Sequence, residues 1–391
     1  MIIGRENELK MLHEAYSDEY SQFVVVYGRR RVGKTFLVRE AFNYKFTFQH
    51  SGIANAPRSS QLEEWGKSLQ KHGLKGKTTP KDWFEAFSFL DDLIRKSRAK
   101  KKVVFIDELP WMDTQASNFV PALEHFWNAY ASARKDVLLI VCGSATSWIV
   151  DKIINNHGGL HNRLNKKINL KQFTLHECEL YAKSRKLGMQ HRQLLECYMV
   201  MGGIPFYWSL LRKDLSLPQN IDGIFFSEDG ELKDEFDALY RSLFKKPESY
   251  LSVINALGKK RIGMTRDEIS TEANLTQGGM LTTILKDLEH CGFIRKYNQI
   301  GKLSKGAMYQ LVDFYTLFYF KFILENKRHD PNFWSKSAGT SLYNNWCGLA
   351  FERVCFAHIP QIKHALSIGG VVSIEYSWFV RRTDDRPGAQ I

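Results

Sequence analysis

The stretch that decides the fold is Gly28-Arg29-Arg30-Arg31-Val32-Gly33-Lys34-Thr35. It fits the pattern G-x-x-x-x-G-K-[ST], in which the glycines let the backbone curl so that its N–H groups point at phosphate oxygens. An apolar run at residues 23–27 precedes the pattern, and a helical stretch at residues 35–42 follows it. The positive end of that helix would face the same anion. The stretch therefore predicts a phosphate-binding turn between a strand and a helix.

Two loop residues carry the expected chemistry. Lys34 is expected to bring a mobile positive charge to the β- and γ-phosphates of a nucleotide, and the Thr35 hydroxyl is expected to bind Mg²⁺. We expect the other loop residues and the one that follows to contact the nucleotide as well, namely Gly28, Arg29, Arg30, Arg31, Val32, Gly33 and Phe36. The alternative is a glycine-bounded turn that contains an accidental lysine.

Two acidic residues follow a second apolar run, at residues 103–106. A strand that closes on a carboxylate places Asp107 at the carboxyl end of the sheet, where an α/β fold binds its ligands. We expect Asp107 to hold Mg²⁺, directly or through water, and Glu108 to orient and polarise the attacking water. The alternative is a strand end followed by two surface acids. The phosphate-binding pattern upstream favours the functional interpretation.

Two further residues are candidates for catalysis. Ser144 follows the apolar run at residues 137–141, where a small polar side chain can sense the γ-phosphate and align water. Arg163 precedes the strand-like residues 168–170, where an arginine can stabilise transition-state charge on its own subunit or on a neighbouring one. A small-residue turn and a surface arginine are the respective alternatives.

The spacing of apolar runs indicates the fold class. Short β-rich runs alternate with helical stretches over residues 1–171, at residues 23–27, 45–49, 103–106, 137–141 and 168–170. Strands of this kind, joined by crossover helices, predict a parallel α/β sheet that is covered on both faces. The strand signal largely disappears over residues 172–244, where leucines at helical spacings predict a helical unit.

Composition limits the classes of function. Among 391 residues, 55 Lys and Arg stand against 42 Asp and Glu, which gives a formal net charge of +13. This excess suits contact with a polyanion, although it can also be solubility charge. The strongly basic run 95–102 is interpreted as a solvated helix end before a buried strand. The six cysteines form no C-x-x-C pair, so no disulfide framework or structural zinc is expected. With no signal peptide and no apolar stretch of membrane-spanning length, we expect a cytoplasmic protein without membrane contact.

The motifs together resemble the archaeal-type ATPase family, a branch of the AAA-like and STAND-like P-loop ATPases. The matching pieces are Gly4-Arg5-Glu6-x-Glu8-Leu9, the loop 28–35, the strand ending Asp107-Glu108-Leu109-Pro110-Trp111, and Gly202-Gly203-Ile204-Pro205. The resemblance extends over essentially the whole chain. It implies that Ile3, Gly4 and Arg5 line an adenine pocket and that Gly203 and Pro205 close a helical lid, residues 172–244, over the base. From the residues alone, Gly202-Gly203 is a helix break followed by proline.

Residues 245–313 show the order of a winged helix-turn-helix: three helical patterns and then two strand patterns around the turn 301–306. Thr265 and Glu268 form a capping box at the second helix, and the third begins near Thr276. In such modules the third helix enters the DNA major groove and the wing touches phosphates. The candidate DNA contacts are Gln277, Thr282, Thr283 and Lys286 on the helix and Lys302 and Lys305 on the wing. The alternative is a winged helix that serves intramolecular packing or protein contact.

Residues 314–391 resemble the start of a PD-(D/E)xK nuclease-like domain, with Glu352 in its first acidic position. The Asp and Glu-x-Lys that would complete the metal site are expected after the point where this chain ends, so an incomplete α/β domain and no nuclease activity are predicted. A catalytic Mg²⁺ in such sites is normally held by more than one carboxylate.

The leading hypothesis is an ATP-hydrolysing P-loop enzyme whose nucleotide state repositions the winged helix on double-stranded DNA. ATP or ADP and Mg²⁺ are its expected ligands, and a homo-oligomer is compatible with the sequence. The alternative is a STAND-like nucleotide-gated switch or DNA-binding regulator with negligible turnover. A third interpretation is a decayed remnant of a mobile-element protein.

Overall fold

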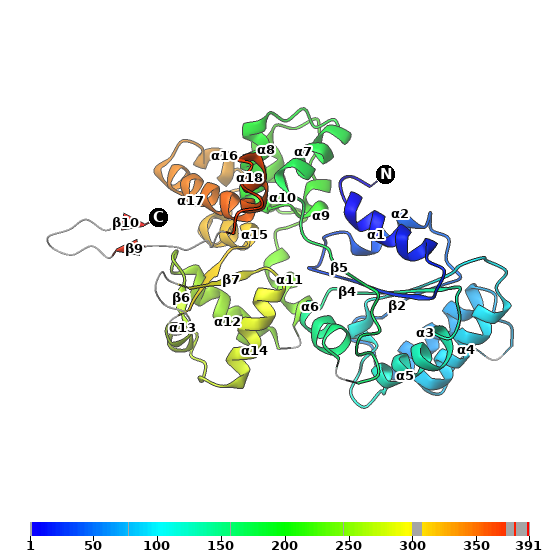
Figure 1. Cartoon of the computed structure of the whole chain (residues 1–391). Helices are drawn as coiled ribbons and strands as arrows, with labels where there is room; N and C mark the ends of the chain where they lie inside the picture. Colours follow the sequence, from blue (N-terminus) through cyan, green and yellow to red (C-terminus); the bar gives the residue numbers. More distant parts are fainter. Residues whose placement is uncertain are drawn as a thin grey trace. The chain divides into compact units, whose positions relative to one another are not determined.

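The computed structural model describes residues 2–76, 78–156, 158–244, 246–298, 307–372, 379–380 and 389–390. The chain divides into two compact units, Met1–Lys171 and Gln172–Ile391 (Figure 1).

The first unit is built on a parallel sheet of five strands in the order β2-β3-β4-β1-β5. The strands are β1 (Gln22–Tyr27), β2 (Phe48–Ser51), β3 (Lys102–Asp107), β4 (Val137–Gly143) and β5 (Lys166–Asn169). The central strand β4 is buried along its whole length, and β1 is buried except at its last residue. The parallel α/β sheet expected from the sequence is confirmed.

Helices cover both faces of this sheet. In Figure 1, α1 and α2 lie on one face, and α3, α4 and α5 lie on the other. The large aromatic core belongs to the second face, where Trp65, Trp83 and Phe126 are buried with the sheet residues Phe23 and Phe48. The helical segments are α1 (Glu6–Ser17), α2 (Lys34–Ala41), α3 (Arg58–Lys71), α4 (Trp83–Lys96), η1 (Leu109–Trp111), α5 (Phe119–Phe126), η2 (Trp127–Ala131), α6 (Thr146–Ile149) and η3 (Val150–Ile154).

The edge strand β2 starts later than the sequence pattern indicates. We expected it at residues 45–49, and it spans Phe48–Ser51. Asn43 and Tyr44 adopt left-handed backbone conformations with φ of 50° and 59°, and the Lys45 N–H donates to the Phe42 carbonyl at 2.9 Å. This turn uses residues that the apolar pattern assigned to the strand.

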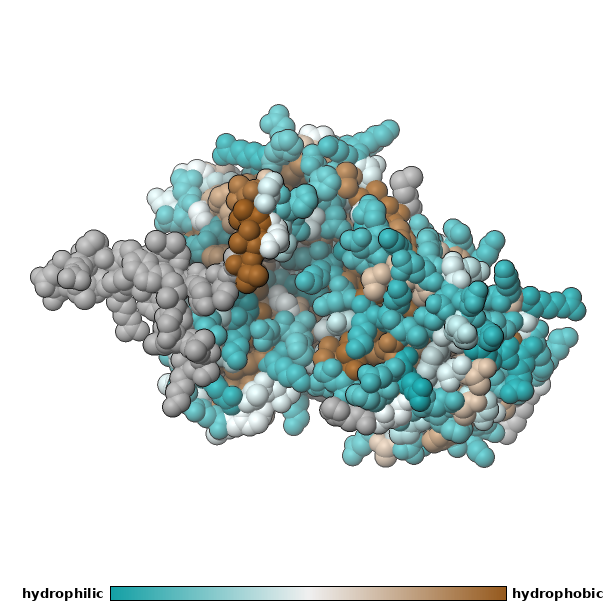
Figure 2. Space-filling view, in the orientation of Figure 1, coloured by the Kyte–Doolittle hydropathy of each residue, from teal (hydrophilic) through white to brown (hydrophobic). Residues whose placement is uncertain are grey.

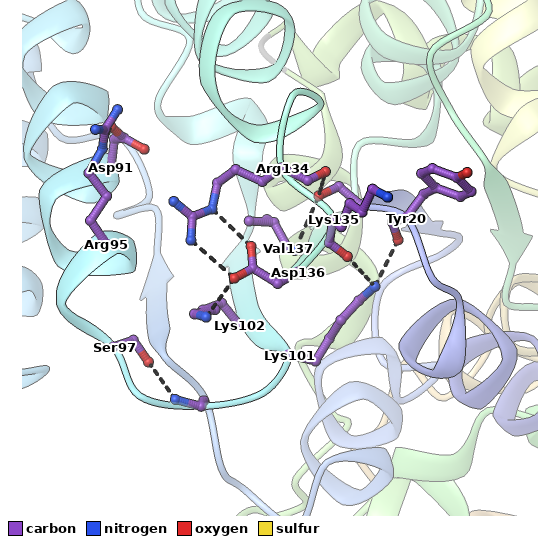
Figure 3. A network of polar contacts seen from close by, with 12 residues as sticks. Tyr20, Asp91, Arg95, Ser97, Lys101, Lys102, Arg134, Lys135, Asp136 and Val137 are labelled. Atoms are coloured by element: carbon purple, nitrogen blue, oxygen red, sulfur yellow. Dashed lines mark hydrogen bonds and ion pairs between the residues drawn. The ribbon is translucent and has the colours of Figure 1, made fainter.

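The basic run 95–102 is only partly solvated, which corrects our interpretation of it (Figure 3). Arg95 pairs with Asp91 at 2.6 Å, and Lys102 pairs with Asp136 at 2.6 Å. The Lys101 ammonium is buried and donates to the backbone carbonyls of residues 18, 20 and 135 at 2.7, 2.7 and 3.2 Å. Lys96, Arg98 and Lys100 are exposed, and Arg95 is exposed as well despite its ion pair.

The second unit is mainly helical. Its helical segments are α7 (Leu175–Ser184), α8 (His191–Met201), α9 (Pro205–Ser209), α10 (Leu217–Phe225), α11 (Glu235–Leu243), α12 (Pro247–Gly258), α13 (Arg266–Glu272), α14 (Gly279–His290), α15 (Phe314–Phe318), η4 (Tyr319–Ile323), α16 (Phe333–Ser337), α17 (Ser341–Ala357) and α18 (Ile359–Ala365). Its strands are β6 (Met264–Thr265), β7 (Ile294–Tyr297), β8 (Met308–Leu311), β9 (Phe379–Val380) and β10 (Ala389–Gln390). The helices expected over residues 172–244 are formed, as α7 to α11.

An aromatic segment forms the core of the second unit. The run at residues 314–322 folds as α15 and η4, which bury Phe314, Tyr315, Phe318 and Phe322. Tyr198 of α8 lies with its ring centroid 5.1 Å from that of Phe314. The dense aromatic pattern therefore serves packing.

Helices α12, α13 and α14 precede a hairpin of β7 and β8, and the short β6 completes a sheet of order β6-β8-β7. Thr265 and Glu268 form the expected capping box at α13. Helix α14 begins at Gly279, three residues after the start that we predicted at Thr276, because the Gly278 backbone is still extended.

The segment after α18 is irregular, and its residues Val371 and Val372 are not in a strand. Figure 2 shows apolar surface gathered beside α18 and the segment after it, where Leu366, Ile368 and Val372 are exposed. Strands β9 and β10 pair antiparallel through Val380 and Ala389. No helix among the described residues is long and apolar enough to cross a membrane.

Candidate functional site

The candidate site lies at the carboxyl edge of the parallel sheet in the first unit. The pairing register aligns Tyr27 of β1 with Gly143 of β4, and Ile106 of β3 with Val141 of β4. The loop after β1, the acidic pair at the end of β3 and the serine after β4 therefore leave the sheet at one edge. This is the edge at which open parallel sheets bind their ligands.

The loop has the backbone shape that the glycine pattern predicts. Gly28 has a φ of 144°, and a Cβ there would collide with the Leu170 carbonyl. Gly33 has a φ of 91° and directly precedes α2, while Arg31 between them also adopts a positive φ of 68°. A residue without a side chain is needed at Gly28, where the backbone directly after β5 approaches this closely. The loop therefore curls back on itself before the helix begins.

Lys34 lies inside this loop. Its ammonium is buried and donates to the carbonyls of Gly28 and Arg29, each at 2.9 Å. It also lies 3.4 Å from the Ser144 hydroxyl. The lysine thus reaches the residue that follows β4. None of these three hydrogen-bond partners is a carboxylate. An ammonium placed in this way is available to an incoming anion.

Thr35 and Asp107 form the second part of the site. The Thr35 hydroxyl donates to the Asp107 carboxylate at 2.6 Å, and the other carboxylate oxygen accepts from the Glu108 N–H at 2.9 Å. Asp107 is 3% exposed, so its orientation is fixed by these contacts. A hydroxyl and a carboxylate in contact are hard oxygen ligands of the kind that Mg²⁺ takes beside nucleotide phosphates. The residues therefore fit a magnesium site completed by phosphate oxygens.

Glu108 has an unusual backbone. Its φ and ψ are 50° and 48°, a left-handed conformation that a non-glycine residue rarely adopts. The Ser144 hydroxyl donates to one carboxylate oxygen of Glu108, and the Ser144 N–H donates to the other at 3.2 Å. Strained backbone of this kind is concentrated at functional sites. Ser144 therefore contacts both Glu108 and Lys34, which the sequence did not predict.

Buried neighbours hold the site in place. Gln61 of α3 is fully buried, and its amide donates to the carbonyls of Ile53 and Trp111 at 2.6 and 3.1 Å. It thereby ties the loop after β2 to the segment after Glu108. Behind the strand ends, burial and the nearby Asp107 carboxylate raise the pKa of the Cys142 thiol well above its usual range. No sequence pattern marks Gln61, because its role depends on tertiary contacts.

The residues that the family resemblance assigns to the base have structural contacts. Arg5 is buried, and its guanidinium donates to the Lys171 carbonyl at 2.7 Å and lies 3.9 Å from Glu8. Gly4 beside it is also buried. Arg5 thus joins the start of α1 to the end of β5.

Pro205 lies in the second unit, where it opens α9. A Cβ at Gly203 would collide with the Phe173 carbonyl, so this turn needs a glycine for packing within the unit. The helix break that the residues alone predict is therefore present.

The remaining loop candidates differ in exposure. Val32 is buried, Arg29, Arg30 and Arg31 are partly exposed, and Phe36 is 48% exposed. Arg163 is exposed, and among the described residues its side chain makes no hydrogen bond or ion pair with the loop. The structure therefore unites the loop, Asp107, Glu108 and Ser144 in one site.

The described DNA candidates of the second unit lie on α14, except Gln277, which lies two residues before the helix begins. Gln277, Thr282, Thr283 and Lys286 are all exposed. Gln277 donates to Asp267 at 3.0 Å, and the two threonine hydroxyls donate to backbone carbonyls of residues 278 and 279. Thr282 and Thr283 lie four and three residues before Lys286, so the three share one face of α14. Lys302 and Lys305 lie outside the described residues.

Glu352, the residue that resembles a nuclease acid, has arginine partners. It lies in α17, 3.0 Å from Arg261 and 3.6 Å from Arg353. Arg353 is 7% exposed and donates to the Arg261 carbonyl at 2.9 Å. Burial is the main reason that the pKa of Arg353 falls to about 10. No group of three or more metal-ligating side chains exists among the described residues.

A curled glycine loop with an internal lysine, followed by a helix and faced by a strand-end aspartate, defines the class of P-loop nucleotide-binding proteins. The family described as an ATPase domain predominantly from Archaea matches residues 2–211. The chain belongs to this family.

Relatives extend the likeness beyond the matched residues. An uncharacterized protein of Methanocaldococcus jannaschii is 25% identical over 369 residues, which cover 93% of this chain and 78% of that one. A Walker-type ATPase of Pyrococcus abyssi has a similar fold, with a TM-score of 0.57 at 18% identity, over 82% of this chain and 96% of that one. An uncharacterized ATP-binding protein of M. jannaschii is 36% identical over 45 residues, or 12% of this chain and 76% of that one.

Proposed function

We propose that the chain binds Mg·ATP at the carboxyl edge of the sheet in its first unit and hydrolyses it. The observation that carries this proposal is the continuous set of contacts in which Lys34 meets Ser144, Ser144 meets Glu108, and Thr35 meets Asp107. It combines an anion-binding cation, two hard oxygen ligands and an acid on strained backbone within one edge of the sheet.

Each group has a role in binding. The Lys34 ammonium exchanges its carbonyl partners for phosphate oxygens, and the loop N–H groups bind the same anion. Thr35 and Asp107 would hold Mg²⁺, whose charge offsets the charge that develops on the phosphates. Gly4, Arg5 and Pro205 remain proposed neighbours of the base, as the family resemblance implies.

Hydrolysis depends on positioning and electrostatics more than on covalent chemistry by the protein. Glu108 releases Ser144, orients a water molecule toward the γ-phosphate and polarises it. Ser144 is then free to donate its hydroxyl to the phosphate. Arg163 is proposed to stabilise transition-state charge, on its own chain or on a neighbouring one.

The second unit is proposed to carry a winged helix from α12 to β8 that binds duplex DNA. Its support is the order of three helices and a hairpin, together with the exposed face of α14. Thr282, Thr283 and Lys286 would face the major groove, and Lys302 and Lys305 would lie near phosphates. The helical lid, moved through Pro205 of the turn Gly202–Pro205, would transmit the nucleotide state to this module.

Steady-state ATP hydrolysis, measured with and without duplex DNA, tests the proposal. Wild type is compared with Lys34→Ala and with Lys100→Ala, an exposed lysine outside the site that matches the charge change. We expect Lys34→Ala to lose about a hundred- to a thousandfold in rate and the control to keep wild-type activity. A rate that duplex DNA raises in wild type but not in Lys286→Ala supports the DNA part. Equal loss in Lys34→Ala and Lys100→Ala would contradict the ATPase assignment.

One observation favours a second candidate, a nucleotide-gated switch with negligible turnover. Ser144 donates two hydrogen bonds to Glu108, so the acid is held away from water-activating geometry. If this arrangement persists with ATP bound, the chain binds nucleotide tightly and turns it over slowly. Tight ATP binding without a Lys34-dependent rate would support this candidate.

A further inference from the structure

A second charged feature of the first unit lies away from the phosphate loop. An open groove of about 1560 Å³ follows the edge strand β2, and none of residues 28–35 lines it. Pockets for small ligands usually enclose about 300–1,000 Å³. The size of the groove therefore suits a segment of an extended polymer better than a small molecule.

The groove is strongly basic. Lys45, Lys71 and Lys96 line it and are exposed, and Arg39 lines it half-buried. Glu64 is the one carboxylate among the described lining residues, and it already lies 2.6 Å from a lysine, Lys67. The field inside the groove is therefore positive and attracts an anion.

Only some of the basic residues of the run 95–102 line the groove. Figure 3 shows that Arg95 and Lys102 are engaged by carboxylates and that Lys101 is engaged by backbone carbonyls. Lys96 is exposed and lines the groove, whereas Arg98 and Lys100 are exposed and do not line it. The run thus contains both a groove cation and matched cations outside the groove.

Exposed aromatic rings accompany these charges. Tyr16 and Tyr44 line the groove and are 42% and 57% exposed. The Tyr16 ring centroid lies 5.7 Å from that of Phe42, another lining residue. Tyr44 stands on left-handed backbone with a φ of 59°, which is rare for a bulky residue. Aromatic faces between cations form the arrangement on which nucleic-acid bases stack.

A buried polar group also lines the groove. His50 is 4% exposed, and its Nδ1 lies 2.9 Å from the hydroxyl of Ser68, which lines the groove as well. Its Nε2 has no hydrogen-bond partner among the described residues. Burial lowers the pKa of His50 to about 4, so the ring is neutral near pH 7 and adds no positive charge to the groove.

We propose that this groove binds single-stranded DNA. Phosphates contact Lys45, Lys71 and Lys96, and bases stack on Tyr16 and Tyr44. A duplex keeps its bases stacked inside the helix and has no free base faces for these rings, so a single strand fits better. The choice of DNA over RNA rests on the proposed function, and the groove itself is independent of α14.

Binding of a fluorescent oligodeoxythymidine of about 20 nucleotides to the full chain tests the proposal. We expect Lys71→Ala with Lys96→Ala to weaken binding at least about tenfold and to reduce the salt slope by about 1.4, or 0.7 per lost phosphate contact. The control pair, Arg98→Ala with Lys100→Ala, removes the same charge outside the groove and should bind nearly as well as wild type. Equal weakening by both pairs, or no binding by wild type, would overturn the proposal.

A second comparison tests stacking. Tyr44→Ala should weaken binding about tenfold, and Tyr44→Phe should restore it because the aromatic face is kept. An unchanged affinity in Tyr44→Ala would contradict the stacking role. Lys286→Ala separates this site from the proposed winged helix: it should impair duplex binding and leave oligodeoxythymidine binding intact. If the proposed winged helix is wrong, the duplex-binding assay shows it. If the groove is wrong, the oligodeoxythymidine-binding assay shows it.

Discussion

Two glutamates that sequence patterns single out occupy contrasting surroundings in the two units. Glu108 stands on left-handed backbone after β3, and its carboxylate accepts from the uncharged Ser144. Glu352 lies within the regular helix α17, and its carboxylate lies near Arg261 and Arg353. One acid is held by neutral donors on strained backbone, and the other is neutralised by cations.

The difference separates an acid that can do chemistry from one that supports structure. A carboxylate bonded to a hydroxyl can exchange that partner for water with little change in local charge. A carboxylate beside Arg353 leaves that buried guanidinium without its neighbouring negative charge when it moves, which is unfavourable. The contacts of Glu352 with Arg261 and Arg353 give it a packing role in the second unit, and the absence of nuclease activity stays a prediction.

The largest expected effect tests the two acids directly. Glu108→Gln should lower the rate of ATP hydrolysis about a hundred- to a thousandfold while ATP binding is kept, because the amide cannot polarise water as the carboxylate does. Glu352→Gln makes the same chemical change and should leave the rate within about twofold of wild type. Hydrolysis and nucleotide affinity are measured on both variants.

The comparison fails if the two substitutions have similar effects on hydrolysis. A wild-type rate too low to measure, with tight ATP binding, would instead place Glu108 in a switch. In that case the hydrogen bonds from Ser144 are the resting arrangement of the acid and not a step toward catalysis.

The sequence predicted the parallel sheet and the backbone shape of the phosphate loop for a physical reason. Gly28, Lys34 and Thr35 are close in sequence, and the glycine pattern specifies the backbone that brings them together. Asp107 was found because an apolar run ending in a carboxylate marks a strand end, and parallel strands share one edge. Short-range pattern and sheet topology together were sufficient for these residues.

Other features could not be predicted because they depend on tertiary burial. Gln61 is an ordinary polar residue in a helical pattern, and only the fold places it between two loops of the site. Lys101 lies in a basic run for which the sequence predicts solvent exposure, yet its ammonium is buried and donates to backbone carbonyls. The predicted start of β2 was wrong because Asn43 and Tyr44 form a turn in the left-handed conformation although neither is a glycine.

A smaller effect is the pH dependence of the stability of the first unit, which His50 should cause. Burial lowers the pKa of His50 in the first unit from 6.5 to about 4. The unfolded chain therefore binds a proton at higher pH than the folded chain, so stability is fully present above about pH 6.5 and is lost as pH falls toward 4. His50 should account for about 2 kcal/mol of lost unfolding free energy between pH 7 and pH 5.

Urea unfolding of wild type and His50→Gln at the two pH values measures this contribution. The variant is expected to start from a lower stability at pH 7, since packing around the ring is lost, and to show a weaker dependence on pH. Parallel pH dependence in both proteins would mean that other groups of the first unit are responsible.

The smallest expected effect concerns the structural role of Glu352. Glu352→Gln removes the negative charge near Arg353, which stays buried and donates to the Arg261 carbonyl. Because Glu352 and Arg261 are 32% and 51% exposed, solvent screens the pair, and we expect a loss of only about 1 kcal/mol in the stability of the second unit. Urea unfolding is followed by tryptophan fluorescence, with the exposed Glu289→Gln as the charge-matched control. If Glu352→Gln were as stable as this control, the arginine contacts would contribute nothing to packing. The contrast with Glu108 would then rest on backbone strain alone.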